Sequence, residues 1–161
     1  MQFKELLSNP NIEFGEMEES FFLLGLLSAF DNRYQAMADR FFEEMSWKQF
    51  FAIICIDLCK ENPTINELAG IMGSSHQNVK QILLKLEKKG FVVVITDEED
   101  KRKQRVIITE KTKKFCKEHE AGSNKAVAAI FKGITKEQLQ TTIRTIMQME
   151  ENLNQEGERY I

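Results

Sequence analysis

Residues 64–109 have the sequence TINELAGIMGSSHQNVKQILLKLEKKGFVVVITDEEDKRKQRVIIT. The stretch contains a short helical pattern, a glycine at Gly73, and a second helical pattern that ends at Gly90. Two runs rich in β-branched residues, 91–96 and 105–109, then flank a charged loop, which is typical of a β-hairpin. We therefore expect two helices joined by a tight turn and followed by a hairpin.

The second helix of this pair has one apolar face and one polar face. Its apolar residues recur at i, i+3, i+4 and i+7, which predicts an amphipathic helix. They are Val79, Ile82, Leu83 and Leu86. Glutamine and asparagine can each form two hydrogen bonds with adenine, and lysine can reach guanine or phosphate. The residues expected to contact DNA are Ser75, which also caps the helix, His76, Gln77, Asn78, Lys80, Gln81 and Lys85. An ordinary solvated helix face is the alternative for this segment taken alone.

The first helix of the pair begins at Thr64, and Glu67 follows three residues later. This spacing predicts a capping box, in which each side chain binds the backbone amide of the other residue. Pro63 is expected to end the helix before it, because the residue before a proline disfavours the helical conformation. The apolar residues expected to pack on the second helix are Ile65, Leu68, Ala69 and Met72.

The loop of the hairpin is acidic in its first half and basic in its second half. Residues 97–100 are Asp-Glu-Glu-Asp, and the basic residues that follow are Lys101, Arg102, Lys103 and Arg105. An arginine at a hairpin tip can enter a narrow minor groove, where the electrostatic potential is most negative. A solvated loop is the alternative, but the helix pair just before it favours a DNA contact.

The distribution of charge supports a nucleic-acid partner. The protein has 161 residues and a formal net charge of −3. Residues 75–114 hold 11 basic and 6 acidic side chains, whereas residues 1–74 hold 5 and 12. Positive charge therefore coincides with the second helix and the hairpin, as a nucleic-acid footprint requires. The sequence predicts a mainly α fold with a small β-hairpin wing, which is a winged helix-turn-helix flanked by long dimerisation helices.

The same stretch resembles the MarR family of bacterial transcriptional regulators. The resemblance is carried by the serine-capped helix that ends LEKKGFV at 86–92, by Asp100 and Arg102, and by VIIT at 106–109. It covers this stretch closely and the flanking helices loosely. The positions that depart from the family pattern are Gln77, Asn78, Leu84, where the family residue is usually charged, and Thr112, where it is usually glycine.

The resemblance implies roles for particular residues and partners. Arg102 would be the wing-tip arginine of the minor groove, and Asp100 the acidic residue that orients the wing. A symmetric homodimer on a pseudo-palindromic operator of double-stranded DNA is implied as well. Relatives often bind a small aromatic or amphipathic effector between the dimerisation helices and the DNA-binding lobe, and this binding lowers DNA affinity. The residues expected to line such a cavity are Phe22, Leu26, Phe30, Trp47, Phe51 and Cys55, for which plain core packing is the alternative.

Four further helices are expected outside the helix pair. Residues 21–30, FFLLGLLSAF, are too few to span a membrane and predict a buried helix that continues to Phe41. Residues 110–132 and a stretch that starts near Thr135 predict two long helices after the hairpin. Another helix is expected over residues 46–61, with an apolar face made of Trp47, Phe50, Phe51, Ile54 and Leu58.

These elements suggest a single domain over residues 1–161 with two regions. Residues 1–44 and 115–161 would form a helical dimerisation region, and residues 45–112 the winged helix-turn-helix lobe. Packing of the long helices within one chain is the alternative to dimerisation. The acidic N-terminus has no apolar signal segment, so we expect a cytoplasmic protein.

Side chains suited to catalysis or metal binding are sparse. Cys116, His119 and Glu120 fall within about one helical turn, but no second cluster supplies the remaining ligands, so no metal is expected. Cys55 and Cys59 are more typical of core packing than of a redox switch. The sequence contains no phosphate-binding loop and no nucleophile with an adjacent base, so neither an enzyme nor a cofactor is expected.

A second hypothesis is a winged-helix module that binds another protein and does not bind DNA. This hypothesis predicts that Gln77, Gln81 and Arg102 are dispensable. It also predicts that partner binding is insensitive to salt, whereas DNA binding depends strongly on salt.

Overall fold

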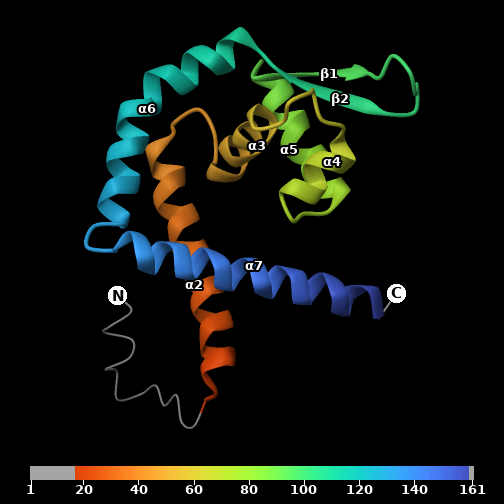
Figure 1. The fold of residues 1–161 in the computed structure, drawn as a ribbon. Coiled ribbons are helices and arrows are strands. Elements are labelled where there is room, and N and C mark those ends of the chain that lie inside the picture. Colours follow the sequence, from red (N-terminus) through yellow and green to blue (C-terminus); the bar gives the residue numbers. More distant parts are fainter. Residues whose placement is uncertain (1–16, 160–161) are drawn as a thin grey trace. The chain divides into compact units, whose positions relative to one another are not determined.

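The computed structural model describes residues 17–159 and divides into two compact units, with the boundary between Lys113 and Lys114. The elements of the first unit are α2 (Glu19–Phe41), α3 (Trp47–Asp57), α4 (Ile65–Ile71), α5 (His76–Lys88), β1 (Val92–Thr96), β2 (Gln104–Ile108) and the start of α6 (Glu110–Ile130) (Figure 1). The second unit contains the rest of α6 and all of α7 (Lys136–Arg159). Over these described residues, no helix combines the length and the apolar character that crossing a membrane requires.

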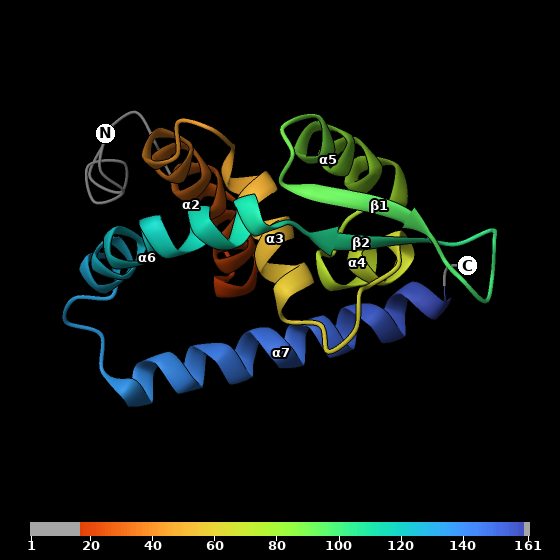
Figure 2. The same cartoon turned by 90° about the horizontal axis from the view of Figure 1, so that it is seen from above.

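The predicted fold class is confirmed, because α4, α5 and the hairpin form a winged helix-turn-helix. Strands β1 and β2 pair antiparallel, with a register that runs from Val92 opposite Ile108 to Thr96 opposite Gln104. Helices α3, α4 and α5 gather against one face of this hairpin, and its loop extends beyond them (Figures 1 and 2). The wing is therefore supported at its base and reaches past the helices at its tip.

The chain before α4 lies beside β2 as an extended segment. The backbone N–H of Val106 donates to the carbonyl of Pro63 over 2.9 Å, and Thr64 forms an isolated bridge with Arg105. The prediction of a helix over residues 46–61 was wrong at its end, since α3 stops at Asp57. The bonds to β2 require an extended chain at Pro63 and Thr64, so the helix has to end before these residues.

The predicted apolar face of α3 was also wrong in part. The predicted side chains are half-buried, except Leu58, which is 76% exposed. The side chains that α3 buries are Gln49, Ala52, Ile53, Cys55 and Ile56. Helix α3 contacts α2, α4, α5 and β2, so it has more than one covered side. Its aromatic residues face α2, where Tyr34 meets the edge of Trp47 at 4.7 Å between ring centroids.

The two caps of the helix pair form as the sequence predicts. Thr64 and Glu67 make the capping box: Glu67 N–H donates to Thr64 Oγ1 over 3.2 Å, and Thr64 N–H donates to Glu67 Oε2 over 2.7 Å. Ser75 Oγ accepts from the N–H of Asn78 over 3.2 Å at the start of α5. Each cap satisfies backbone amides that the first turn of a helix leaves unpaired.

The chain leaves α5 through Gly90, which has a φ of +76°, a conformation that favours glycine. Phe91 follows and is fully buried. The start of α6 returns to this exit: Thr109 Oγ1 donates to the carbonyl of Gly90 over 2.8 Å, and Thr112 Oγ1 donates to the carbonyl of Phe91. The ammonium of Lys111 lies 4.2 Å from the centre of the Phe91 ring. The exit of α5 and the first turn of α6 are therefore bonded to each other.

In the second unit, α6 ends two residues earlier than predicted, at Ile130, and Gly133 follows with a φ of +81°. Helix α7 begins close to Thr135, as predicted, and reciprocal hydrogen bonds between Thr135 and Gln138 form a capping box at its start. Helix α7 presents a row of apolar side chains that are each more than one-third exposed in a single chain. They are Leu139, Ile143, Ile146, Met147 and Leu153.

Candidate nucleic-acid interface

Helix α5 has a buried face and an exposed row opposite to it. The buried face consists of Val79, Ile82, Leu83 and Leu86. At about 100° per residue, four side chains point most directly away from that face, and all four are exposed. This exposed row is Gln77, Gln81, Leu84 and Lys88. The side chains of this row are therefore accessible to a partner such as the major groove of DNA.

One flank of α5 and the wing form the two walls of a groove of about 490 Å³. His76 and Lys80 supply the wall on α5, and Arg102 and Lys103 supply the wall on the wing. The other lining residues are Thr64, Ile65, Asn66, Glu67, Gln104 and Arg105. The structure thus brings together residues that were predicted to contact DNA from two segments more than twenty positions apart. Both walls of the groove carry cations.

The turn of the wing is organised by Asp97, which was not among the residues expected to have a role in the site. Its side chain is only 6% exposed. Asp97 Oδ1 accepts from the N–H of Asp100 over 2.7 Å and from the N–H of Glu99 over 2.9 Å, and Arg105 Nε donates to Oδ2. An aspartate that binds backbone amides two and three residues later is a known signal for a turn, and that signal was present in the run that begins at residue 97.

Arg105 has a different role from the one expected for it. It was grouped with the cations that face DNA, but its guanidinium binds Asp97 and donates to the carbonyl of Asn62 over 2.7 Å. The side chain is 32% exposed, which is far less than for its neighbours in the loop. Arg105 therefore fastens the wing to the chain before α4 rather than presenting its charge to a partner.

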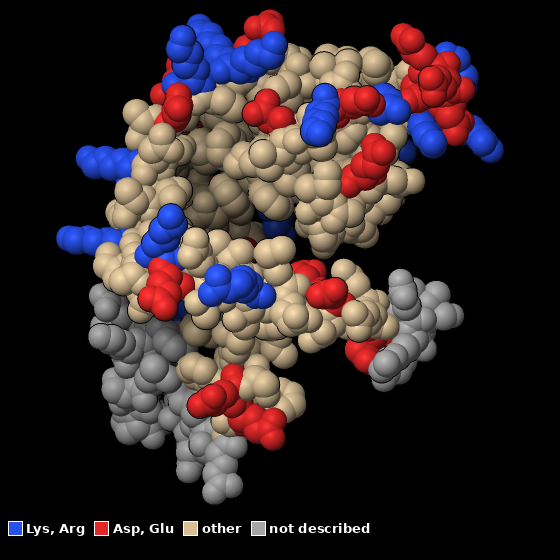
Figure 3. Space-filling view, viewed as in Figure 1, with Lys and Arg blue, Asp and Glu red and all other residues tan. Residues whose placement is uncertain are grey.

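Arg102 lies at the tip of the wing with its side chain 92% exposed. Asp100 Oδ1 accepts from both the backbone N–H and the Nε of Arg102, over 3.1 and 3.2 Å. The second carboxylate oxygen of Asp100 is 3.8 Å from Lys103 Nζ. Figure 3 shows acidic and basic side chains together at the far end of the hairpin. Asp100, in the acidic half of the loop, thus positions Arg102 and Lys103 in the basic half.

The pKa of Asp97 is lowered from its ordinary value of 3.8 to about 2, first by the amide of Asp100 and then by Arg105. Because the folded pKa is the lower one, the carboxylate stabilises the wing fully above about pH 4, and this contribution is lost as pH falls towards about 2.

We expect the NMR amide signals of Glu99 and Asp100 to shift with a midpoint near pH 2. The Asp97→Asn variant should lack this transition, and a wild-type midpoint at 3.8 would contradict the assignment.

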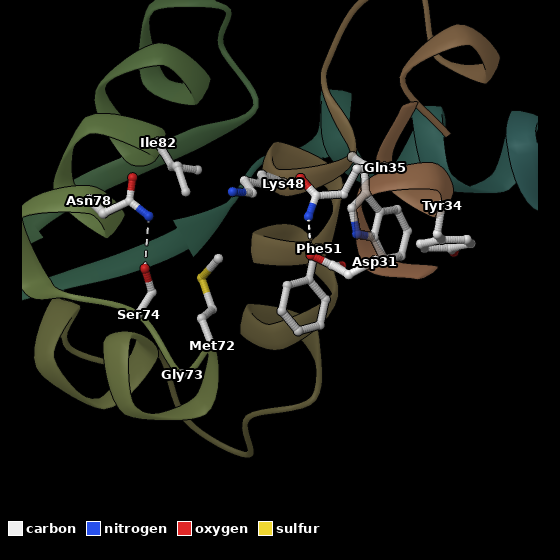
Figure 4. A pocket seen from close by; sticks show the side chains of 11 residues that line it. Asp31, Tyr34, Gln35, Lys48, Phe51, Met72, Gly73, Ser74, Asn78 and Ile82 are labelled. Carbon is white, nitrogen blue, oxygen red and sulfur yellow. Dashed lines mark hydrogen bonds between the residues drawn. The ribbon is translucent and has the colours of Figure 1, made fainter. Parts of the chain in front are cut away.

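The opposite flank of α5 faces a second pocket of about 420 Å³ within the first unit (Figure 4). Asn78 lies on this flank, and its amide donates to Ser74 Oγ over 2.8 Å, so Asn78 borders both the exposed row and the pocket. The lining residues from α2 and α3 are Asp31, Tyr34, Gln35, Trp47, Lys48 and Phe51, and those from α4, the turn and α5 are Met72, Gly73, Ser74, Asn78 and Ile82.

Two of the six residues expected to line an effector cavity, Trp47 and Phe51, do line this pocket, and their rings stack at 5.9 Å between centroids. The other four expected residues are not among its lining residues. Cys55 is buried on another side of α3, Phe22 and Leu26 are half-buried, and Phe30 is 52% exposed.

Cys55 and His119 each lie close to a neighbouring group on their own helix or beside it. Burial raises the pKa of the Cys55 thiol, and the nearby Cys59 raises it further, which keeps the reactive thiolate form scarce. In the second unit, His119 Nδ1 is 2.9 Å from the carbonyl of Phe115, and the two rings stack. Within residues 17–159, no group of three or more potential ligands is arranged to hold a metal ion, and this includes Cys116, His119 and Glu120.

Comparison with known proteins agrees with this architecture. Residues 45–103 match the model of the MarR family. A MarR protein from Peptoclostridium difficile DA00132 is similar in structure, with a TM-score of 0.77 and 19% identity over 91% of this chain and 95% of that chain. A MarR/EmrR family transcriptional regulator from Acinetobacter sp. ADP1 has a TM-score of 0.76 and 12% identity over 86% and 99% of the chains. The S. aureus MepR–DNA complex has a TM-score of 0.72 and 16% identity over 86% and 99%. The resemblance to the MarR family is therefore confirmed, and the chain has the fold of MarR-family transcriptional regulators.

Proposed function

The chain carries a MarR-family winged helix-turn-helix, and from this premise we propose that it is a transcriptional regulator that binds double-stranded DNA as a homodimer. The observation that carries the proposal is the groove between α5 and the wing, which has Lys80 on one wall and Arg102 and Lys103 on the other. Cations on two walls match the charge of a phosphate backbone. The similar MepR structure is a complex with DNA, which supports the same partner here.

In this proposal, the exposed row of α5 reads bases in the major groove and the wing meets the flanking minor groove. Gln77 and Gln81 supply paired donors and acceptors for adenine, and Ser75 and His76 in the first turn approach the backbone. Arg102 is directed by Asp100 towards the minor groove. The other cations of the interface, which neutralise phosphate, are Lys80, Lys85, Lys101 and Lys103.

The homodimer is supported by apolar surface that a single chain leaves exposed. In α2, Phe21, Leu24 and Phe30 are each more than half exposed. In α7, the apolar row from Leu139 to Leu153 is exposed along the helix. Apolar faces of this extent on long helices are typical of subunit interfaces. A symmetric dimer would place two recognition helices on half-sites about one helical turn apart, on a pseudo-palindromic operator in the bacterial cytoplasm.

We expect the protein to bind DNA from upstream of its own gene with an affinity that falls steeply as salt rises. The Gln77→Ala variant should lose about 1–3 kcal/mol of discrimination at one base pair in each half-site, because two hydrogen bonds to a base edge are removed. Fluorescence anisotropy against the operator and single-base variants, at two salt concentrations, measures both effects. Gln155→Ala, an exposed change in α7, should alter neither.

Absence of salt-dependent DNA binding would exclude the regulator and favour a winged-helix module that binds another protein. If Gln77→Ala binds DNA with an unchanged base preference, the proposal of DNA binding stands, but Gln77 does not read a base.

We also propose that the pocket beside Trp47 binds a small aromatic or amphipathic effector, and that binding releases the DNA, so that the protein acts as a repressor. Three aromatic side chains, Tyr34, Trp47 and Phe51, provide stacking surface in this pocket. Asp31 and Lys48 provide one charge of each sign. The opposite wall is formed by the turn before α5 and by α5 itself, so an occupant contacts the helix that reads the DNA.

Trp47 is the only tryptophan of the chain, which makes its fluorescence a direct probe of this pocket. We expect saturable changes in its emission on titration with benzoate or with benzyltrimethylammonium, which carry an aromatic ring and opposite charges. Phe51→Ala should weaken the response several-fold by removing a stacked ring, whereas Leu58→Ala, an exposed change just after α3, should leave it unchanged. A response that is equal in wild type and Phe51→Ala would contradict binding at this pocket.

A further inference from the structure

Leu84 occupies the exposed row of α5, three residues after Gln81 and seven after Gln77. Its side chain is 49% exposed, while the four apolar side chains of the opposite face are buried. Burial stabilises a protein only in proportion to the apolar surface that leaves water. Packing within the chain therefore does not explain a leucine at this position of an otherwise polar row.

The side chains around Leu84 are long and polar. Lys80 and Lys88 lie one turn before and one turn after it, and Gln81 and Lys85 flank it. One leucine among lysines is far smaller than the apolar area that a protein interface requires. The same surroundings suit DNA, because lysine neutralises phosphate and the methyl group of thymine is the apolar group on the floor of the major groove.

We infer that Leu84 recognises a thymine through the C5-methyl group of the base, and this inference rests on the proposed DNA binding. Gln77 and Leu84 are separated by about 10.5 Å along the helix, at about 1.5 Å per residue. Successive base pairs are about 3.4 Å apart along the axis of the duplex. A helix that follows the major groove is inclined to this axis, so the thymine lies no more than about three base pairs from the base that Gln77 contacts, which limits the spacing within each half-site.

The experiment begins with duplexes that wild-type protein selects from a random pool. Each thymine of the selected site is then replaced singly by deoxyuridine, which lacks only the methyl group. We expect one thymine in each half-site at which this change weakens binding about fourfold, the equivalent of about 0.8 kcal/mol for one buried carbon. Leu84→Ala, which keeps a good helix former at an exposed site, should bind both duplexes equally. Leu58→Ala, at an exposed leucine outside α5, should retain the fourfold difference.

Equal binding of wild type to thymine and deoxyuridine at every position would overturn the inference and leave the proposed function intact. A fourfold difference that persists in Leu84→Ala would also overturn it, because the methyl group would then act through the shape of the duplex. If the pool yields no bound duplex, both the inference and the proposed function are rejected.

Discussion

Replacement of Phe91 by alanine is expected to lower the free energy of unfolding by about 3–5 kcal/mol. The ring is fully buried at the exit of α5, where the helix, the hairpin and the first turn of α6 meet. Its removal loses apolar burial and leaves a cavity that bonded neighbours cannot close. Urea denaturation followed by circular dichroism measures the change, at a fixed chain concentration because the proposed dimerisation would couple stability to concentration.

Val93→Ala is the matched control for this experiment. Val93 lies two residues further along and is 45% exposed. Its replacement should cost no more than about 1 kcal/mol, the range of strand preference at an exposed site. A comparable loss in the two variants would contradict the placement of Phe91 at the centre of the core.

Reversal of two charges, Lys80→Glu together with Arg102→Glu, is expected to weaken DNA binding roughly a hundredfold or more at about 0.1 M salt. The two side chains lie on opposite walls of the groove. Each lost phosphate contact makes the slope of log affinity against log salt less steep by about 0.9. At this salt concentration, that change corresponds to a nearly tenfold loss of affinity. Fluorescence anisotropy over a range of salt gives the affinity and the slope from the same titrations.

The control for charge reversal changes the net charge equally but outside the winged helix-turn-helix. Lys125→Glu together with Lys132→Glu meets this condition, since both lysines are exposed in the second unit. Its affinity should stay within a few-fold of wild type, provided that gel filtration shows the same oligomeric state. An equal loss in both double variants would mean that net charge, rather than the groove, controls binding.

The parts of the fold that depend on neighbouring residues were predictable from the sequence. The caps at Thr64 and Ser75 and the left-handed exit at Gly90 each rest on residues within a few positions. The buried face of α5 was also predicted, because a helix that packs on one side leaves a simple periodic pattern.

The parts that depend on distant residues were not predictable. Arg105 belongs to a basic run, and only its contact with the carbonyl of Asn62, 43 positions away, shows that it is a structural residue. The buried side of α3 was misjudged because this helix is covered by four elements, which removes the periodic pattern. The pocket beside Trp47 draws its walls from α2, α3, the turn at Gly73 and α5, and no local pattern indicates that set.

The bonds that Thr109 and Thr112 make to the carbonyls at the end of α5 have an evolutionary consequence. They join the end of α5 to the first turn of α6, so we expect these two segments to shift together. In the proposed regulator, substitutions on the exposed row of α5 would alter the preferred bases without changing this junction. Substitutions further along α6 would alter the distance between the two proposed half-sites without changing base preference. We therefore expect the base preference and the half-site spacing to vary independently among relatives of this protein.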